Sequence, residues 1–264
     1  MMKVRMPVLF LGHGNPMNAI EENEFVEGFS NIAKTISVKP KAILCISAHW
    51  ETRGTYVTAM ENPKTIHDFG GFPRELYEVQ YPAQGNPQLA CEIKNMSLKT
   101  SIGLDEKEWG LDHGAWSVIK HLYPEADVPV VELSLDYYKT PQQHFELAQE
   151  LKKLREKGIL IIGSGNLVHN LRLVDWQNMY TPDFAYDWAR ETQQKMNKLI
   201  LDGDYSSLIN YKMLGADFEK AIPTPEHYLP LLYTLALRDK NEEISLFNDK
   251  AVAGSLTMTS VKIG

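Results

Sequence analysis

The chain has 264 residues, of which 44% are hydrophobic and 23% charged, and this composition is typical of a globular protein. Its formal net charge of −7 argues against nucleic acid or an anionic membrane as the main partner. No apolar stretch approaches the roughly 20 residues that a membrane helix needs, and no secretory signal is recognisable near residue 1, so we expect a cytoplasmic protein without a membrane partner.

The first third of the chain predicts a strand, a helix and a second strand. Residues 7–11 form a short apolar run that ends in Gly12-His13-Gly14, and apolar residues at helical spacing predict a helix over 22–35. The β-branched run 43–46 predicts a second strand, buried on both faces, which leads to His49. Because this order indicates a βαβ unit with both strand tips at one edge, we expect His13 and His49 to be neighbours.

The middle of the chain predicts a strand, a loop over this edge and several helices. Residues 56–60 read as a strand, and the turn-rich segment 61–71 carries His67. Asp112-His113-Gly114 leads into a helix expected from residue 117. Short helices are expected at 74–79 and 88–96.

The remainder predicts further alternation of strands and helices around the same edge. The strand 159–162 ends in Gly163-Ser164-Gly165, and His169 follows four residues later. Thr224 or Pro225 could start a helix and would then place His227 in the first turn before the apolar helical segment 228–237. The other expected strands are 128–133, 243–247 and 255–263, and the other expected helices are 141–157, 186–201 and 206–214. With no repeat or linker, residues 1–264 read as one domain.

The eight histidines suggest a metal site. They are His13, His49, His67, His113, His121, His144, His169 and His227. His121 and His144 lie on predicted amphipathic helices and are expected at the surface. His13, His49 and His169 directly follow predicted buried strands. Because neutral imidazole is the commonest protein metal ligand and also serves as a base near pH 7, their convergence indicates a divalent metal with a proton-transfer partner.

Each histidine also has an ordinary structural interpretation. The shared strand-to-loop setting favours a ligand role for His13 and His49, and the assumed topology extends it to His169 and His227. His113 follows Asp112, a potential helix cap, and His67 is either a lid contact or a plain loop residue. The HExxH, Walker A and GxSxG motifs are absent, and no pattern marks Ser164 as a nucleophile. Cys45 and Cys91 fit no zinc or redox spacing, and Cys45 is expected to be a buried, reduced thiol.

Six long motifs, each built around one histidine, resemble the 4,5-DOPA extradiol dioxygenase family. This family is a branch of the class III extradiol ring-cleavage dioxygenases in the LigB-like superfamily. The motifs are GHGNPMNAI, SAHW, TIHDFGGFP, WGLDHGAW, GSGNLVHN and PTPEHYLPLLY. The resemblance runs from His13 to the end of the chain.

The resemblance implies an α/β fold, with a single domain and a central mixed β-sheet flanked by helices. It also implies one divalent metal ion per chain, zinc or Fe(II), held by His13, His49 and His227, with His169 at or beside the metal. In the wider superfamily the third ligand is a glutamate, so Glu226 and His227 both remain candidates for that position.

The implied activity is the opening of the aromatic ring of a catechol such as DOPA by O2. His113 or His169 would move the phenolic proton, and Asp112 would orient His113. Two alternatives remain open at this point: a zinc-dependent hydrolase, and a non-catalytic relative that binds a small molecule. The sequence does not indicate the oligomeric state.

Overall fold

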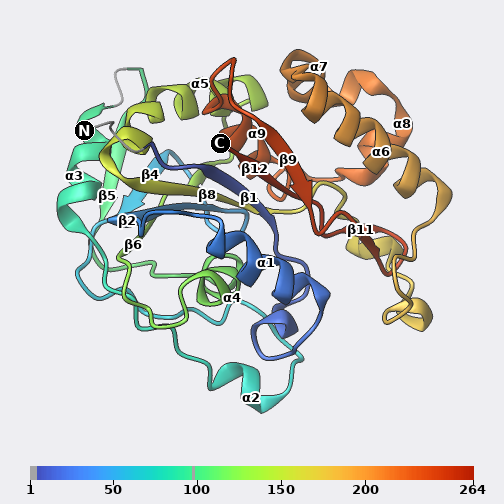
Figure 1. The fold of residues 1–264 in the computed structure, drawn as a ribbon, viewed down its shortest axis with the longest axis horizontal. Helices are drawn as coiled ribbons and strands as arrows, with labels where there is room; N and C mark the ends of the chain where they lie inside the picture. The colour runs from blue at the N-terminus through green and yellow to red at the C-terminus, as the bar shows by residue number, and fades with distance from the viewer. Residues whose placement is uncertain (1–4, 97–98) are drawn as a thin grey trace.

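Six strands form one mixed sheet at the centre of the chain in this computed structural model, which describes residues 5–96 and 99–264 (Figure 1). Their order across the sheet is β6 (Val130–Glu132), β2 (Ala42–Ser47), β8 (Ile159–Gly165), β1 (Val8–Gly12), β12 (Ser260–Ile263) and β9 (Ile244–Phe247). The first four are parallel to one another, and β12 and β9 run antiparallel. The expected α/β fold with a central mixed sheet is confirmed.

The three central strands bring their carboxyl ends to the same edge. Every residue of β1, β2 and β8 is buried, as expected for apolar strands covered on both faces. Gly12 pairs with Gly165, and Ser47 pairs with Ser164, so the three strands end level with one another. The predicted link from β1 through a helix to β2 is present, but β8 lies between these two strands.

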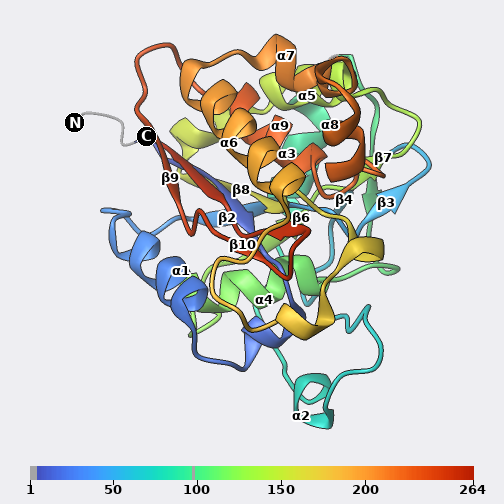
Figure 2. The ribbon, with the colours of Figure 1, turned by 90° about the vertical axis from the view of Figure 1, so that its right-hand side faces the viewer.

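Helices cover both faces of the sheet in a three-layer arrangement (Figures 1 and 2). One face is covered by α1 (Glu24–Lys34) and α4 (His113–Leu122), while α2 (Arg74–Tyr77) projects from the body of the molecule on the same side. The other face packs on α3 (Pro87–Met96), α5 (Pro141–Glu150), α6 (Asp187–Asp202), α7 (Tyr205–Ile209), α8 (Ala216–Ala221) and α9 (Leu229–Ala236). None of the helices in the described ranges is both long and apolar enough to cross a membrane.

Local signals explain where several helices begin. Asn23 accepts hydrogen bonds from the backbone of Phe25 and Val26 at the start of α1. Thr140 and Gln143 form a capping box before α5. Asp112 caps α4 by accepting from the backbone N–H of Ala115, so this helix begins at His113 and not at the expected residue 117.

Several expected elements are shorter than their sequence patterns. The segment 141–157 ends as an α-helix at Glu150 and continues as a 3₁₀ helix at Lys152–Lys157. The segment 206–214 divides into α7 and the 3₁₀ helix Tyr211–Leu214. The expected final strand divides into β11 (Leu256–Thr257) and β12, and β12 pairs antiparallel with both β1 and β9 inside the sheet.

Small ribbons complete the described structure. They pair β3 (Glu51–Thr52) with β7 (Leu135–Asp136), β4 (Thr55–Thr58) with β5 (Ile102–Asp105), and β10 (Ala251–Val252) with β11. Cys45 is buried, as predicted, and neither Cys45 nor Cys91 forms a disulfide in the described structure.

Candidate metal centre

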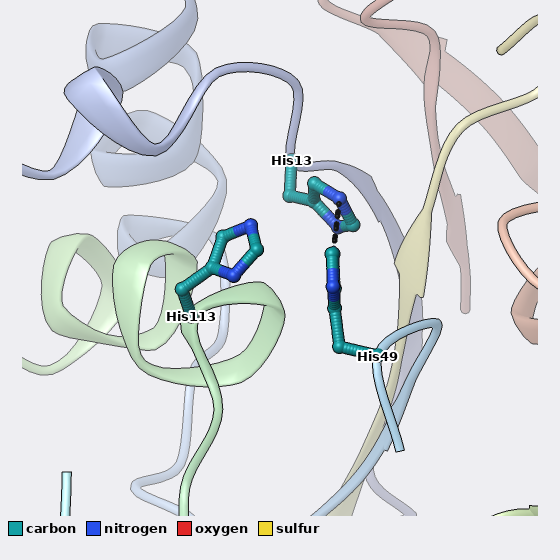
Figure 3. Close-up of side chains that lie close together, drawn as sticks. All are labelled: His13, His49 and His113. Carbon is teal, nitrogen blue, oxygen red and sulfur yellow. Dashed lines mark hydrogen bonds between the residues drawn. The ribbon is translucent and has the colours of Figure 1, made fainter. Parts of the chain in front are cut away.

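His13 and His49 meet at the carboxyl edge of the sheet, as their sequence settings predict (Figure 3). His13 follows β1 directly, and its backbone N–H donates to the carbonyl of Gly165. His49 lies two residues beyond β2, where the N–H of Ala48 donates to the carbonyl of Ser164. The two Nε2 atoms face each other at 3.3 Å.

His113 joins this pair from the first turn of α4. Its ring centroid is 3.9 Å from that of His49 and 5.8 Å from that of His13. Gly114 makes this close approach possible, because a Cβ atom there would lie 2.5 Å from Ser47 Oγ and 2.8 Å from a ring carbon of His49. His13, His49 and His113 form one group whose potential ligand atoms lie within 4.8 Å of one another.

His227 reaches the centre from an irregular segment. The prediction that it lies in the first turn of a helix is wrong, because α9 begins at Leu229. Its carbonyl accepts a hydrogen bond from the N–H of Asn166, and a Cβ atom on Gly165 would lie only 2.0 Å from that carbonyl oxygen. The backbone around His227 is therefore held directly against the end of β8.

His169 lies flat against His227. The ring centroids are 3.6 Å apart and the ring planes differ by 9°. The backbone N–H of His169 donates to the carbonyl of Ala221, the last residue of α8. His169, Glu226 and His227 form a second group with potential ligand atoms within 4.8 Å of one another.

The Nδ1 atom of each of three histidines is held by an oxygen. Nδ1 of His13 lies 3.0 Å from Ser164 Oγ. Because the single hydroxyl proton of Ser164 is donated to the carbonyl of Gly114, Ser164 must accept from His13 Nδ1–H. Nδ1 of His49 lies 3.2 Å from a carboxylate oxygen of Asp68, and Nδ1 of His227 lies 3.2 Å from one of Glu226.

This pattern determines the tautomer. A proton on Nδ1 leaves the Nε2 lone pair of a neutral imidazole free to bind a metal. Glu226 also accepts a hydrogen bond from Thr224 Oγ1 at 2.8 Å, so its oxygen Oε1 is shared by two donors.

The centroids of these three rings form a nearly equilateral triangle. The sides are 5.0 Å between His13 and His49, 5.2 Å between His13 and His227, and 5.1 Å between His49 and His227. Imidazoles that bind one ion at about 2.0–2.1 Å with tetrahedral angles have centroids roughly 5 Å apart. The donor set present therefore fits a tetrahedral metal with three histidine ligands.

Burial keeps most of these imidazoles neutral at pH 7. Burial lowers the pKa of His13 and of His227 well below the usual value, and positive charge on neighbouring histidines lowers both further. Burial also lowers the pKa of His169 to about 4. Neutral rings are the form that binds a metal ion or accepts a proton.

Asp68 gives His49 a different electrostatic environment. Burial alone lowers the pKa of His49, but the hydrogen bond to Asp68 and the charges of nearby carboxylates outweigh it and raise the pKa overall. Asp68 also accepts from the backbone N–H of His113 at 2.9 Å, and its Oδ1 lies 2.9 Å from His113 Nδ1. Burial alone raises the pKa of Asp68, yet the contacts with His113 and His49 hold it below its usual value.

Sequence patterns missed Asp68 and Ser164 and misplaced His144. The available sequence signal for Asp68 is its place directly after His67 in the turn-rich motif TIHDFGGFP. His144 is fully buried and bonded to the hydroxyl of Tyr233, so its expected surface position is wrong. His67 bonds the carbonyl of Val79 and packs among aromatic rings outside the cluster.

Comparisons with known proteins agree with the geometry. Residues 7–258 match the family model described as the catalytic LigB subunit of aromatic ring-opening dioxygenase. The chain is 45% identical over 270 residues to the 4,5-DOPA dioxygenase extradiol of Escherichia coli strain K12, covering 100% of this chain and 97% of that protein. It is 36% identical to the protein of the same name from Beta vulgaris, covering 96% of this chain and 94% of that one.

A solved structure is also similar. The crystal structure of an uncharacterized protein from Escherichia coli K12 has a TM-score of 0.84 and 41% sequence identity, covering 98% of this chain and all of the other. The resemblance inferred from the six motifs is therefore confirmed. Because the family model spans nearly the whole chain, the protein belongs to the LigB family of aromatic ring-opening dioxygenases.

Proposed function

We propose that this protein is a metal-dependent extradiol dioxygenase that opens the aromatic ring of a catechol such as DOPA with O2. The observation that supports it best is the triangle of three imidazoles, each with its Nδ1 held by an oxygen. The relatives named as 4,5-DOPA dioxygenases cover almost the entire chain, which supports the same activity.

His13, His49 and His227 are the proposed metal ligands. Glu226 is assigned to orienting His227, because its carboxylate lies against Nδ1 of that ring. His169 lies 3.6 Å from His227 in a parallel stack, which is closer than rings spread around one tetrahedral ion. We therefore assign His169 to proton transfer beside the metal rather than to the ligand set.

Fe(II) is the metal that fits ring opening, because it can bind a catechol and pass electron density to dioxygen, whereas zinc fits the same ligands but has no accessible redox state. The contribution of the chain is to position and move protons. Neutral His169 accepts the phenolic proton, since its low pKa leaves the ring unprotonated at pH 7. His113, held by Asp68, is the second group within reach for returning a proton to the opened ring.

Oxygen uptake tests this proposal directly. Protein loaded anaerobically with Fe(II) should consume O2 when L-DOPA or another catechol is added, and should form a ring-opened semialdehyde. Protein loaded with zinc is the control and should consume none. Absence of O2 uptake across a panel of catechols, with one bound Fe(II) per chain, would reject the dioxygenase activity.

We also propose that residues 1–264 act as one catalytic domain. The support is that β1, near the start of the chain, pairs with β12 at its end through Val8 and Ile263. Two free cysteines, with Cys45 buried, fit a reducing compartment such as the cytoplasm. A single cooperative transition in urea, seen by two spectroscopic probes, is the expected result for one domain.

A further inference from the structure

Two buried carboxyl groups, those of Glu132 and Asp112, lie in contact beside the histidine cluster. Glu132 ends β6 and Asp112 precedes α4, and both residues are fully buried. Among residues 5–96 and 99–264, no Lys or Arg side chain forms an ion pair with either carboxyl group. Two adjacent negative charges without solvent or a cation are strongly unfavourable, so the pair is expected to retain a proton.

The hydrogen bonds of this pair leave one acceptor without a donor. Glu132 Oε1 accepts from the backbone N–H of Asp112 at 3.0 Å, and its Oε2 accepts from Nε1–H of Trp109 at 3.2 Å. Asp112 Oδ1 accepts from the hydroxyl of Ser47 at 2.6 Å and from the N–H of Ala115 at 3.1 Å. Asp112 Oδ2 is buried, and no N–H or O–H group of the described residues donates to it. The side chain of Glu132 is in hydrogen-bond contact with that of Asp112, so a proton on Glu132 supplies the missing donor.

The surroundings favour the proton on Glu132 and the negative charge on Asp112. Asp112 caps α4, and the free N–H groups at the start of a helix stabilise a negative charge. Burial and the charge of Asp112 raise the pKa of Glu132 well above its usual value. Cys45 pairs with Glu132 in the sheet, and burial raises the pKa of its thiol, so Cys45 adds no charge at pH 7.

The carboxylate of Asp112 connects two segments that carry cluster histidines. Ser47, whose hydroxyl donates to Asp112, accepts from the backbone N–H of His49 at 3.2 Å. Asp112 also caps the helix whose first residue is His113. The rings of His49 and His113 have centroids 3.9 Å apart, so the orientation of one carboxylate affects the placement of both.

We propose that Glu132 is a positioning residue of the metal centre, which keeps a proton at neutral pH and donates it in a hydrogen bond to Asp112 Oδ2. The pair then carries one negative charge, and the Asp112 carboxylate is held between the His49 turn and the start of α4. The proton stays on Glu132 throughout, so no bond is formed or broken. This role goes beyond ring opening and does not depend on it, because the shared proton is present without metal or substrate.

Infrared spectroscopy of the metal-free protein tests the protonation directly. At pH 8 the unaltered protein should show the C=O stretch of a protonated carboxyl group, which is separate from the carboxylate bands. Glu132→Gln should lack this band. Asp112→Asn should also lack it, because the new amide donates to Glu132 and allows it to ionise. Glu106→Gln, in the exposed turn after β5, is the control and should keep the band. The assignment is wrong if the unaltered protein lacks the band, or if either of the first two variants retains it.

Zinc affinity, measured by competition with a chelator, tests the positioning role. Glu132→Leu removes the donor to Asp112 Oδ2 and should weaken zinc binding about tenfold, as expected for a residue that orients ligand segments. Glu132→Gln keeps a neutral donor and should recover most of that affinity. An ionised Glu132 predicts otherwise, because both variants would then remove the same charge and change zinc affinity alike.

Equal zinc affinities in the Leu and Gln variants would therefore reject the positioning role. Circular dichroism checks that each variant folds, and the infrared comparison decides the protonation even if Glu132→Leu is unfolded. Failure of the dioxygenase activity would appear separately, as missing O2 uptake in Fe(II)-loaded protein whose infrared band is present.

Discussion

Oxygen atoms next to Nδ1 orient the three histidines that are proposed as ligands. Ser164, Asp68 and Glu226 each hold one ring so that its Nε2 is free. Such partners fix the tautomer and the ring orientation before any metal arrives, which lowers the entropic cost of binding. The oxygens that hold the ligands therefore matter nearly as much as the ligands.

The hydroxyl of Ser164 should contribute measurably to metal affinity. In Ser164→Ala, His13 loses the acceptor for its Nδ1 proton, and both its tautomer and its orientation become free. We expect metal affinity to fall about 10–100-fold, as measured by competition with a chromophoric chelator. The matched control is Ser206→Ala on the exposed face of α7. Equal affinities in the two variants would show that Ser164 does not orient His13.

Removing single imidazoles should separate the ligands from their neighbours. His227→Gln takes away one corner of the triangle, so the protein should not retain a metal equivalent after dialysis. His113→Gln should retain close to one equivalent, because His113 is 3.9 Å from His49 and outside the triangle. Elemental analysis after loading with zinc gives the result. If His113→Gln loses the metal and His227→Gln retains it, then His113, and not His227, is the third ligand.

The sequence predicts a candidate ligand where a recognisable local pattern, such as a buried strand, is followed directly by a histidine. His13 and His49 follow buried strands, so their place at one edge follows from the topology of parallel strands. The roles of Asp68 and Ser164 depend on partners 45 and 151 residues away, respectively, and no local pattern carries that information. The predicted surface position of His144 is wrong because its neighbours in sequence are polar, while its burial depends on a hydrogen bond to Tyr233, 89 residues later.

At the scale of elements, β8 packs closely against His227 and the first turn of α9, and this contact builds the other half of the cluster. A Cβ atom on Gly163 would lie 2.4 Å from the carbonyl oxygen of Pro230, and one on Gly165 would lie 2.0 Å from that of His227. In sequence these glycines flank Ser164 and lack the rest of a dinucleotide-binding fingerprint. Their actual role is to let two backbones approach each other.

Gly165→Ala should therefore impair both folding and metal binding. The added methyl group meets a backbone oxygen that cannot rotate away, so His227 must shift. We expect a loss of about 1–3 kcal/mol in the free energy of unfolding and a clear drop in metal affinity. Gly70→Ala is the control, because a Cβ atom there meets no atom within 4 Å. Urea unfolding and metal titration of the two variants decide whether the close contact is essential.

The position of β8 shows what element order alone leaves undetermined. A strand, helix and strand predict that β1 and β2 are parallel, and they are. The same pattern does not say whether a later strand enters between them, because the crossover helix permits adjacent or separated strands. The helix α9 begins later than the sequence predicts for a related reason. The carbonyl of His227 accepts a hydrogen bond from the N–H of Asn166, a long-range contact that no local pattern reveals.

For the whole molecule, buried neutral histidines make stability depend on pH. Burial lowers the pKa of five of them, namely His13, His121, His144, His169 and His227. As pH falls through the usual histidine pKa of about 6.5, these histidines become protonated in the unfolded chain but stay neutral in the folded chain. Their contribution to the free energy of unfolding therefore decreases as pH falls. The raised pKa values of His49 and Glu132 act in the opposite direction.

The net effect should be a loss of stability on acidification. Each strongly shifted histidine costs about 1 kcal/mol between pH 6.5 and 5.5. His49 and Glu132 offset part of this loss. We therefore expect the free energy of unfolding of the metal-free protein to decrease by about 2 kcal/mol between pH 6.5 and 5.5. Urea titrations at pH 7.5, 6.5 and 5.5 in the presence of a chelator provide the measurement. A free energy of unfolding that stays level or rises on acidification would show that the histidines are protonated in the folded state.

The place of β1 in the sheet has a consequence for how the protein is made. This strand is synthesised well before its two neighbours, β8 and β12, which begin at Ile159 and Ser260. A nascent chain on the ribosome has therefore made His13 long before anything can hold it in place. Because a metal site forms only when its ligands are assembled, the proposed set of His13, His49 and His227 is complete only once His227 has been made. A growing chain that has not yet reached His227 therefore cannot hold the ion at this site.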